Sequence, residues 1–333
     1  MRLLVVFTFI CLVLFASCTE ADYPTARAYK VVQYTLPKEV EKIQLTPELA
    51  LPAEEPGYTL IVPEKSIALA VAFHSGRDTS HPGYEMRFYT EALSRGVAVM
   101  YVTTGNHFEF LFDSARYDQL DTYIKAAVDT LQIPPDQLLF MGMSLAGTRA
   151  MKFASWCLSG KSSHGIRPAA VAICDAPLDF TRFWNDGAFA IKHQTNPTSA
   201  NEATWVNYQL EKNLGGTPQE VPENYRMYSP YVPDMNIDDR LQLFSSVAVR
   251  VYTEPDILWW LGHRQKSYYG MNAIDAAALV RDLRVLGNEQ AELIATTEKG
   301  HHPDGRRHPH SWSIVDNAEL VDWFLESLHA PAQ

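Results

Sequence analysis

Short apolar runs that alternate with amphipathic segments constrain the fold of this 333-residue chain more than any other feature. Strands that are apolar on both faces are typical of a parallel sheet covered by helices on each side. The pattern therefore predicts an α/β fold with a mostly parallel central sheet. Six runs have the length and aliphatic content of buried strands: Ile67–Phe73, Val97–Val102, Leu138–Met141, Ala169–Cys174, Val247–Tyr252 and Ala291–Thr296.

Helical periodicity fills most of the gaps between these runs. One stretch, from about residue 180 to 240, breaks the alternation because it is rich in Asn, Pro, Tyr and Trp and contains no clear strand. A gap this long between core elements predicts a lid-like insertion with a functional role. The predicted helices are Tyr84–Arg95, Asp118–Leu131, Thr148–Trp156, Asn272–Leu286 and Asp316–Leu328.

Residues 1–17 are typical of a signal peptide. A single basic residue, Arg2, precedes an apolar run that is too short to span a bilayer. The string FASC, which ends at Cys18, resembles the lipobox of bacterial lipoproteins and predicts cleavage before Cys18 and its lipidation. Cleavage nearby by an ordinary signal peptidase is the alternative. We therefore expect an exported protein, either a cell-envelope lipoprotein, at the outer membrane because Thr19 follows the cysteine, or a periplasmic or secreted form.

Residues 18–56 are polar and interrupted by proline, so we expect a tether and an arm, followed by one domain over residues 57–330. The formal net charge of -11 argues against a nucleic-acid partner, because phosphate binding needs a basic patch. We expect contact with a membrane only through the N-terminal lipid anchor. Beyond the N-terminal segment, Cys157 and Cys174 lie in apolar runs, which favours two buried thiols, although an exported compartment permits a disulfide.

One serine has the setting of a nucleophile. In Gly142-Met143-Ser144-Leu145-Ala146-Gly147, an apolar strand ends near the first glycine and a helical segment follows the serine. A serine held on such a sharp strand-to-helix turn needs small neighbours on both sides, because the two backbones come close together. The alternative is a tight packing turn in some other α/β fold.

From about Tyr58 to Leu328 the chain resembles the α/β-hydrolases, on the strength of this motif and its context. The resemblance implies that Ser144 is the nucleophile and that Ala146 stands where the commonest consensus has glycine. It also implies an oxyanion hole made by the N–H of Leu145 and by the backbone of Ser75 or Gly76. These two residues belong to a His-Ser-Gly string that follows an early strand.

The same resemblance implies an acid after the next-to-last strand and a histidine before the last helix. Asp256, placed in a loop by Pro255, fits the acid, with Glu254 as the alternative. His310, which directly precedes the final helix, fits the general base, with His301 as the alternative. A metal site built on this histidine-rich loop is a competing interpretation, but no second ligand motif accompanies it, so we expect neither metal nor cofactor.

These residues predict a serine hydrolase that cleaves carboxylic esters through an acyl-enzyme on Ser144. Tryptophans near the predicted site loops suggest a small-molecule or carbohydrate ester, with removal of acyl groups from carbohydrate as one candidate reaction. A serine peptidase with the same triad is an alternative. A catalytically inactive binding lipoprotein on the same scaffold is the other.

Overall fold

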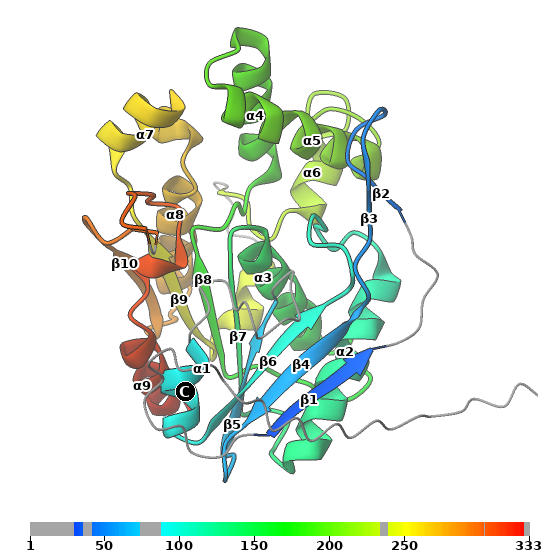
Figure 1. Ribbon diagram of the computed structural model, residues 1–333, viewed down its shortest axis with the longest axis vertical. Helices are drawn as coiled ribbons and strands as arrows, with labels where there is room; N and C mark the ends of the chain where they lie inside the picture. The colour runs from blue at the N-terminus through cyan, green and yellow to red at the C-terminus, as the bar shows by residue number, and fades with distance from the viewer. Residues whose placement is uncertain (1–29, 36–41, 74–87, 234–238, 303, 330–333) are drawn as a thin grey trace, which may run out of the picture.

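The computed structural model of the chain describes residues 30–35, 42–73, 88–233, 239–302 and 304–329, and an eight-stranded sheet runs through its centre (Figure 1). The spatial order is β1-β4-β6-β5-β7-β8-β9-β10. Strand β4 pairs antiparallel with both of its neighbours, β1 and β6, and the remaining neighbours pair in parallel, which confirms the mostly parallel sheet. The strands are β1 Lys30–Thr35, β4 Gly57–Val62, β5 Ala68–Ala72, β6 Val97–Thr103, β7 Leu138–Met143, β8 Ala170–Cys174, β9 Ala248–Thr253 and β10 Ala291–Ala295.

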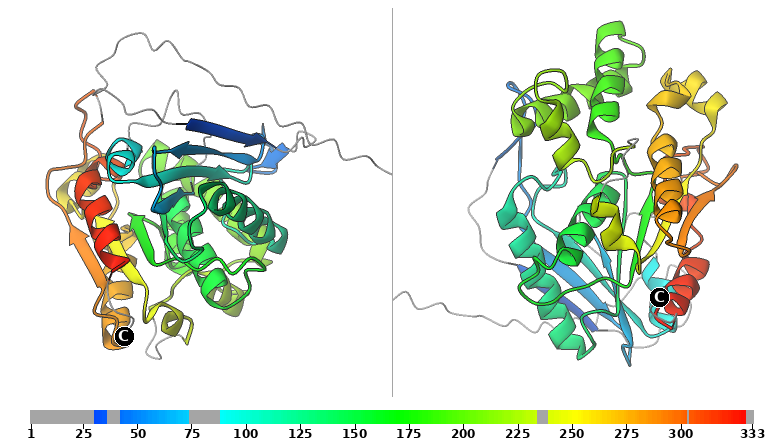
Figure 2. Two further views of the ribbon diagram at one scale, coloured as in Figure 1. Left: turned by 90° about the horizontal axis from the view of Figure 1, so that it is seen from below. Right: turned by 180° about the vertical axis from the view of Figure 1, so that it is seen from behind.

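Helices cover both faces of the sheet (Figure 2). One layer contains α1 (Phe88–Ser94) and α9 (Asn317–Ser327), and the other contains α2 (Ser114–Leu131), α3 (Leu145–Leu158) and α8 (Ala273–Val285). Successive side chains of a strand point to opposite faces. Leu69 of β5 therefore packs in the second layer, while its neighbour Ala70 packs in the first.

The structure contains strands that periodicity did not reveal. Lys30–Thr35, in the segment expected to be a tether, forms the edge strand β1 through backbone pairing with β4. Two further strands, β2 (Lys42–Gln44) and β3 (Ala50–Pro52), form a separate antiparallel pair. Such short strands are defined by the partner to which they hydrogen-bond, and three residues carry too little pattern to be recognised alone.

The stretch in which a lid-like insertion was expected contains three helices, α4 (Phe180–His193), α5 (Pro197–Leu214) and α6 (Pro222–Tyr228). Together with α7 (Ile257–Arg264), they lie beyond the carboxyl ends of the parallel strands (Figure 1). The side chains of Asp179 and Asn196 cap α4 and α5 at their N-termini, which explains where these helices begin.

The expectations on export and on the cysteines can be compared with the described residues in part. The signal peptide of residues 1–17 and Cys18 lie outside the described residues. Cys157 and Cys174 are both buried and free. Within the described ranges, no helix has the length and apolarity needed to cross a membrane.

Strand β7 and helix α3 approach each other so closely that two glycines have no room for a side chain. A Cβ on Gly142 would lie 2.4 Å from the carbonyl carbon of Ala146. A Cβ on Gly147 would lie 2.8 Å from the Cβ of Ala176, which follows β8. The small residues of the motif are therefore required by backbone packing.

Replacing Gly142 by Ala should destabilise the protein by about 1–3 kcal/mol, because the added methyl group meets backbone that cannot move aside. Chemical denaturation followed by circular dichroism measures this change. Gly262→Ala is the matched control, since nothing lies within 4 Å of a Cβ at that position in α7. Equal stability of the two variants would contradict the close packing at Gly142.

Candidate active site

Ser144 is the single residue between β7 and α3, and the chain reverses direction at this point. Its backbone has φ 53° and ψ -129°, a conformation that a residue with a side chain rarely adopts. Two hydrogen bonds hold it: Ser144 N–H donates to the carbonyl of Cys174 at 2.9 Å, and Thr148 N–H donates to the carbonyl of Ser144 at 3.0 Å. Strain of this kind costs about 1–3 kcal/mol and is typical of functional positions.

Leu145 is the first residue of α3, so its N–H lies in the helix turn whose N–H groups have no acceptor within the helix. This position agrees with the expectation that Leu145 donates to an oxyanion. The expected second donor, from Ser75 or Gly76, lies outside the described residues and stays a prediction.

Asp175 follows β8 directly and accepts a hydrogen bond from His310. Nδ1 of His310 lies 2.5 Å from Oδ2 of Asp175. The carboxylate is buried, with 8% of the Asp175 side chain exposed, and the backbone of Asp175 is left-handed at φ 45°. Because Cys174 accepts the hydrogen bond from Ser144 N–H, Asp175 lies next to the turn that carries Ser144. The structure thus brings Ser144, Asp175 and the histidine loop to one edge of the sheet.

Two histidines of this loop, His308 and His310, have opposite electrostatic surroundings. Burial disfavours the charged form of His310, but the hydrogen bond and negative charge of Asp175 outweigh it and raise the pKa of His310. Burial, together with the charge of His310, lowers the pKa of His308 to about 4. Nδ1–H of His308 donates to the carbonyl of His310 at 2.9 Å, and its Nε2 accepts from Arg264 at 3.0 Å, as in a neutral imidazole.

The expected acid, Asp256, has partners other than His310. Asp256 accepts hydrogen bonds from the backbone N–H of Trp259 at 2.9 Å and from the Arg307 guanidinium at 2.8 Å. Its carboxylate caps α7 instead of pairing with His310. The ring nitrogen that an acid would orient is already bound to Asp175.

Glu254, the alternative acid, organises the histidine loop. Its carboxylate is buried and accepts from the hydroxyl of Thr296 at 2.8 Å and from the N–H of Gly300 at 3.1 Å. It also accepts from Lys299 N–H and from the guanidinium of Arg307. All four donors belong to β10 or to the loop that follows it, so Glu254 holds that loop against the end of β9.

His301, the alternative base, lies on the surface of this loop. Its ring is exposed, and Nδ1 lies 3.3 Å from the carbonyl of Lys299. Among the residues that the structure describes, no group of three or more His, Cys, Asp and Glu side chains could hold a metal ion.

Two buried cations of α3 hold the loop of residues 107–112 beside the site. Arg149 donates to the carbonyls of Phe73 at 3.1 Å and His107 at 3.0 Å. Lys152 donates to the carbonyl of Phe110 at 2.7 Å, and its ammonium lies 4.6 Å from the centre of the Phe112 ring. Burial lowers the pKa of Lys152 to about 7, although Glu109 opposes the shift.

Aromatic side chains lie near two of the candidate site residues, His310 and Leu145. The Trp260 ring centre lies 6.5 Å from that of His310. Trp205 of α5 packs edge-on against Phe108 at 4.8 Å, in the same region where Leu145 contacts the α4–α6 helices. Both tryptophans are half-buried. Aromatic side chains thus lie near His310 and in the cluster that Leu145 contacts.

Asp175 is not among the candidate residues that the sequence pattern suggests, yet the structure places it against His310. Its signal was available: Asp175 is the first polar residue after the apolar run Ala169–Cys174, and polar residues at the carboxyl ends of parallel strands commonly carry function. The resemblance places the acid after the next-to-last strand, whereas Asp175 follows β8, the strand before the α4–α6 helices.

Comparisons with known proteins relate the chain to solved structures. No family model matches the chain, and no curated protein does. A carboxyl esterase from Tuber melanosporum aligns with a TM-score of 0.54 and 14% identity over 92% of this chain and 88% of that one. An acylaminoacyl peptidase from Pyrococcus horikoshii aligns at 0.52 and 15% identity over 92% of this chain. A bifunctional GH43-CE protein from Bacteroides eggerthii aligns at 0.52 and 16% identity over 81% of this chain.

The chain spans 42% and 36% of the lengths of the last two proteins. At these identities the likeness concerns the fold, and the strand order and the strained turn between β7 and α3 agree with it. The fold is that of the α/β-hydrolases.

Lys152→Met should change how stability depends on pH. The pKa of a lysine is about 10.4 in the unfolded chain, whereas that of Lys152 is about 7 in the folded protein. The unfolded state therefore binds more protons between these values, so the parent gains stability as pH rises through this window. Denaturant unfolding of both proteins at about pH 7 and about pH 9 should show this gain only in the parent. Lys125→Met on α2 controls for loss of a surface lysine, and a parallel pH response in both Met variants would refute the assignment.

Proposed function

We propose that the protein is a serine hydrolase that cleaves carboxylic esters, with Ser144 as nucleophile, His310 as general base and Asp175 as the acid that orients His310. The observation that carries this proposal is the 2.5 Å hydrogen bond between His310 and Asp175, at the edge of the sheet where Ser144 has its strained backbone. A buried carboxylate bound to Nδ1 selects the tautomer whose Nε2 accepts a proton.

Each residue has one role in the proposed reaction. His310 takes the proton of the Ser144 hydroxyl as that oxygen attacks the ester carbonyl, and returns it to the departing alcohol. Asp175 stabilises the imidazolium that forms between these steps. The N–H of Leu145 donates to the oxyanion, an interaction typically worth about 3 kcal/mol of barrier. Water then hydrolyses the acyl-enzyme with His310 again as base.

The finer substrate class is an acylated carbohydrate. Its support is the aromatic side chains near the candidate residues, Trp260 beside His310 and Trp205 in the cluster that Leu145 contacts, because aromatic faces stack against the apolar faces of sugar rings. The esterase with the same fold is consistent with ester cleavage, whereas the peptidase keeps amide cleavage as the alternative.

Ser144→Ala should abolish both covalent labelling by a fluorophosphonate and turnover of a small aryl ester. Asp175→Asn should lower kcat by about 10³- to 10⁴-fold, because the amide stabilises the wrong imidazole tautomer. Asp256→Asn is the matched control: asparagine caps a helix about as well as aspartate, so the variant loses the charge that pairs with Arg307 and should keep most of the activity. A parent that is not labelled would indicate a binding protein, and turnover of peptide amides without esters would indicate a peptidase.

His310→Ala should remove ester turnover, whereas His301→Ala should retain it, since Nδ1 of the exposed His301 ring lies against the carbonyl of Lys299 and that of His310 against a carboxylate. Steady-state kinetics with the same aryl ester measures both variants. Loss of turnover in His301→Ala alone would transfer the role of the base to His301.

A further inference from the structure

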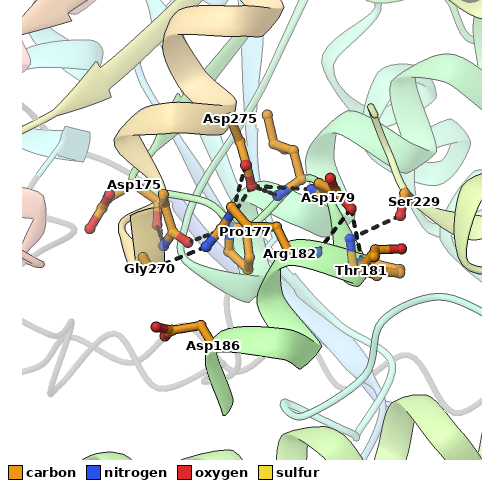
Figure 3. A network of polar contacts seen from close by, with 12 residues as sticks. Asp175, Pro177, Asp179, Thr181, Arg182, Asp186, Ser229, Gly270 and Asp275 are labelled. Carbon is orange, nitrogen blue, oxygen red and sulfur yellow. Dashed lines mark hydrogen bonds and ion pairs between the residues drawn. The ribbon is translucent and has the colours of Figure 1, made fainter. Parts of the chain in front are cut away.

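A buried ion pair lies directly behind the turn that carries Asp175 (Figure 3). Arg182, in the first turn of α4, donates from Nε to Oδ1 of Asp275 at 2.6 Å and from Nη2 to Oδ2 at 2.7 Å. Asp275 is fully buried, and 13% of the Arg182 side chain is exposed. Removing two charges from water is costly unless their geometry and further hydrogen bonds compensate. The pair therefore needs a structural or functional reason.

Asp275 also binds the chain that follows Asp175. Its Oδ2 accepts from the backbone N–H of Leu178 at 3.0 Å and of Asp179 at 3.1 Å. Asp275 lies in the first turn of α8, where an acidic side chain commonly binds N–H groups of its own helix. Here the carboxylate binds another segment instead.

Asn272 connects the ion pair to Asp175 itself. Its Oδ1 accepts from Nη2 of Arg182 at 2.9 Å, and its Nδ2 donates to the backbone carbonyl of Asp175 at 2.8 Å. Asn272 is the N-cap residue of α8, yet its side chain makes no capping hydrogen bond. An asparagine at this position ordinarily caps its helix. Here α8 lacks that cap, because one end of the Asn272 amide binds Asp175 and the other binds Arg182.

These contacts determine a backbone that Asp175 would not otherwise adopt. Its N–H donates to the carbonyl of Tyr252 at 2.8 Å, its carbonyl accepts from Asn272, and φ is 45°. A left-handed conformation of a residue other than glycine persists only where the surroundings impose it. The direction of the Asp175 carboxylate follows from this conformation.

We propose that Asn272, held by the Arg182–Asp275 pair, is a positioning residue that fixes the Asp175 carboxylate against His310. Arg182 brings the first turn of α4 into the same network, and one turn later Asp186 pairs with Lys266 at 2.6 Å. The α4–α6 helices and the orientation of the acid thus depend on one set of hydrogen bonds. This inference rests on the proposed function.

Asn272→Ala tests the inference. Without its donor, the Asp175 turn relaxes and the carboxylate moves away from Nδ1 of His310. We expect kcat on a small aryl ester to fall about ten- to hundredfold, which is the loss expected from small misplacement of a catalytic group. KM should change little, because Asn272 does not contact the ester in this scheme.

The pH dependence provides a readout that a merely structural role would not change. The groups that act on His310 are Asp175, Glu202, Lys266 and His308. Only the contact with Asp175 is altered in Asn272→Ala. Nuclear magnetic resonance titration of the His310 ring, and the acidic limb of kcat/KM, should both move downward toward the ordinary histidine pKa of about 6.5.

Asn288→Ala is the matched control. Asn288 is a buried asparagine whose side-chain amide also donates to backbone, to the carbonyls of Phe244 at 2.6 Å and Val247 at 2.9 Å. These carbonyls lie before β9, at the end of the sheet away from the site. Its loss should lower stability and leave the titration of His310 unchanged.

Arg182→Lys keeps the test decisive if Asn272→Ala does not fold. A lysine retains the charge but cannot bind both oxygens of Asp275 and Asn272 together, so the same shifts should appear at reduced size. An unchanged His310 titration and unchanged kcat in the folded variants would overturn the inference. A parent without labelling or turnover would instead defeat the proposed function, and the titration would still decide how Asp175 is positioned.

Discussion

The hydrogen bond between Asp175 and His310 joins two segments that are far apart in the chain, and the surrounding structure is arranged around its two ends. On one side, Asp175 needs a left-handed backbone directly after a buried strand, which Asn272 and Tyr252 hold from both sides of the residue. On the other, His310 belongs to a loop without regular structure. That loop is fixed because buried Glu254 binds its backbone and the Arg307 guanidinium.

The two carboxylates at the end of β9 illustrate how similar residue patterns serve different purposes. Glu254 and Asp256 share one guanidinium, that of Arg307, and each also accepts backbone N–H groups. Their negative charges are thus compensated by donors that shape the loop and begin a helix. Asp175 has a histidine as its partner, and the resulting pair couples protonation of the ring to a buried charge. The distinction lies in the partner, which no local sequence pattern specifies.

Much of the fold could be predicted, because buried positions appear in the sequence as apolar runs for strands and as apolar residues at helical spacing. The six apolar runs appear as β5 to β10, and four of the five predicted helices appear with shifts of a few residues at their ends; the fifth, Tyr84–Arg95, begins outside the described residues and contains α1. The turn at Ser144 could also be predicted from the sequence, because Gly142 and Gly147 lie where the structure has no room for a side chain. Strand β1 could not be predicted in this way, because its pairing depends on β4.

The contacts of Asp175 could not be predicted either, because its partners His310 and Asn272 lie more than ninety residues away in sequence.

The position of Arg182 limits how the α4–α6 segment could be exchanged between proteins of this fold by protein engineering. The α4–α6 segment looks like a module that could be replaced to alter which molecules reach the site, since its helices lie outside the sheet (Figure 1). Its first turn, however, carries a side chain that belongs to the support of Asp175. A transplanted segment must therefore begin after Arg182, or bring with it its own partners for Asp275 and Asn272. The boundary of the module is set by this buried ion pair and not by the start of the helix.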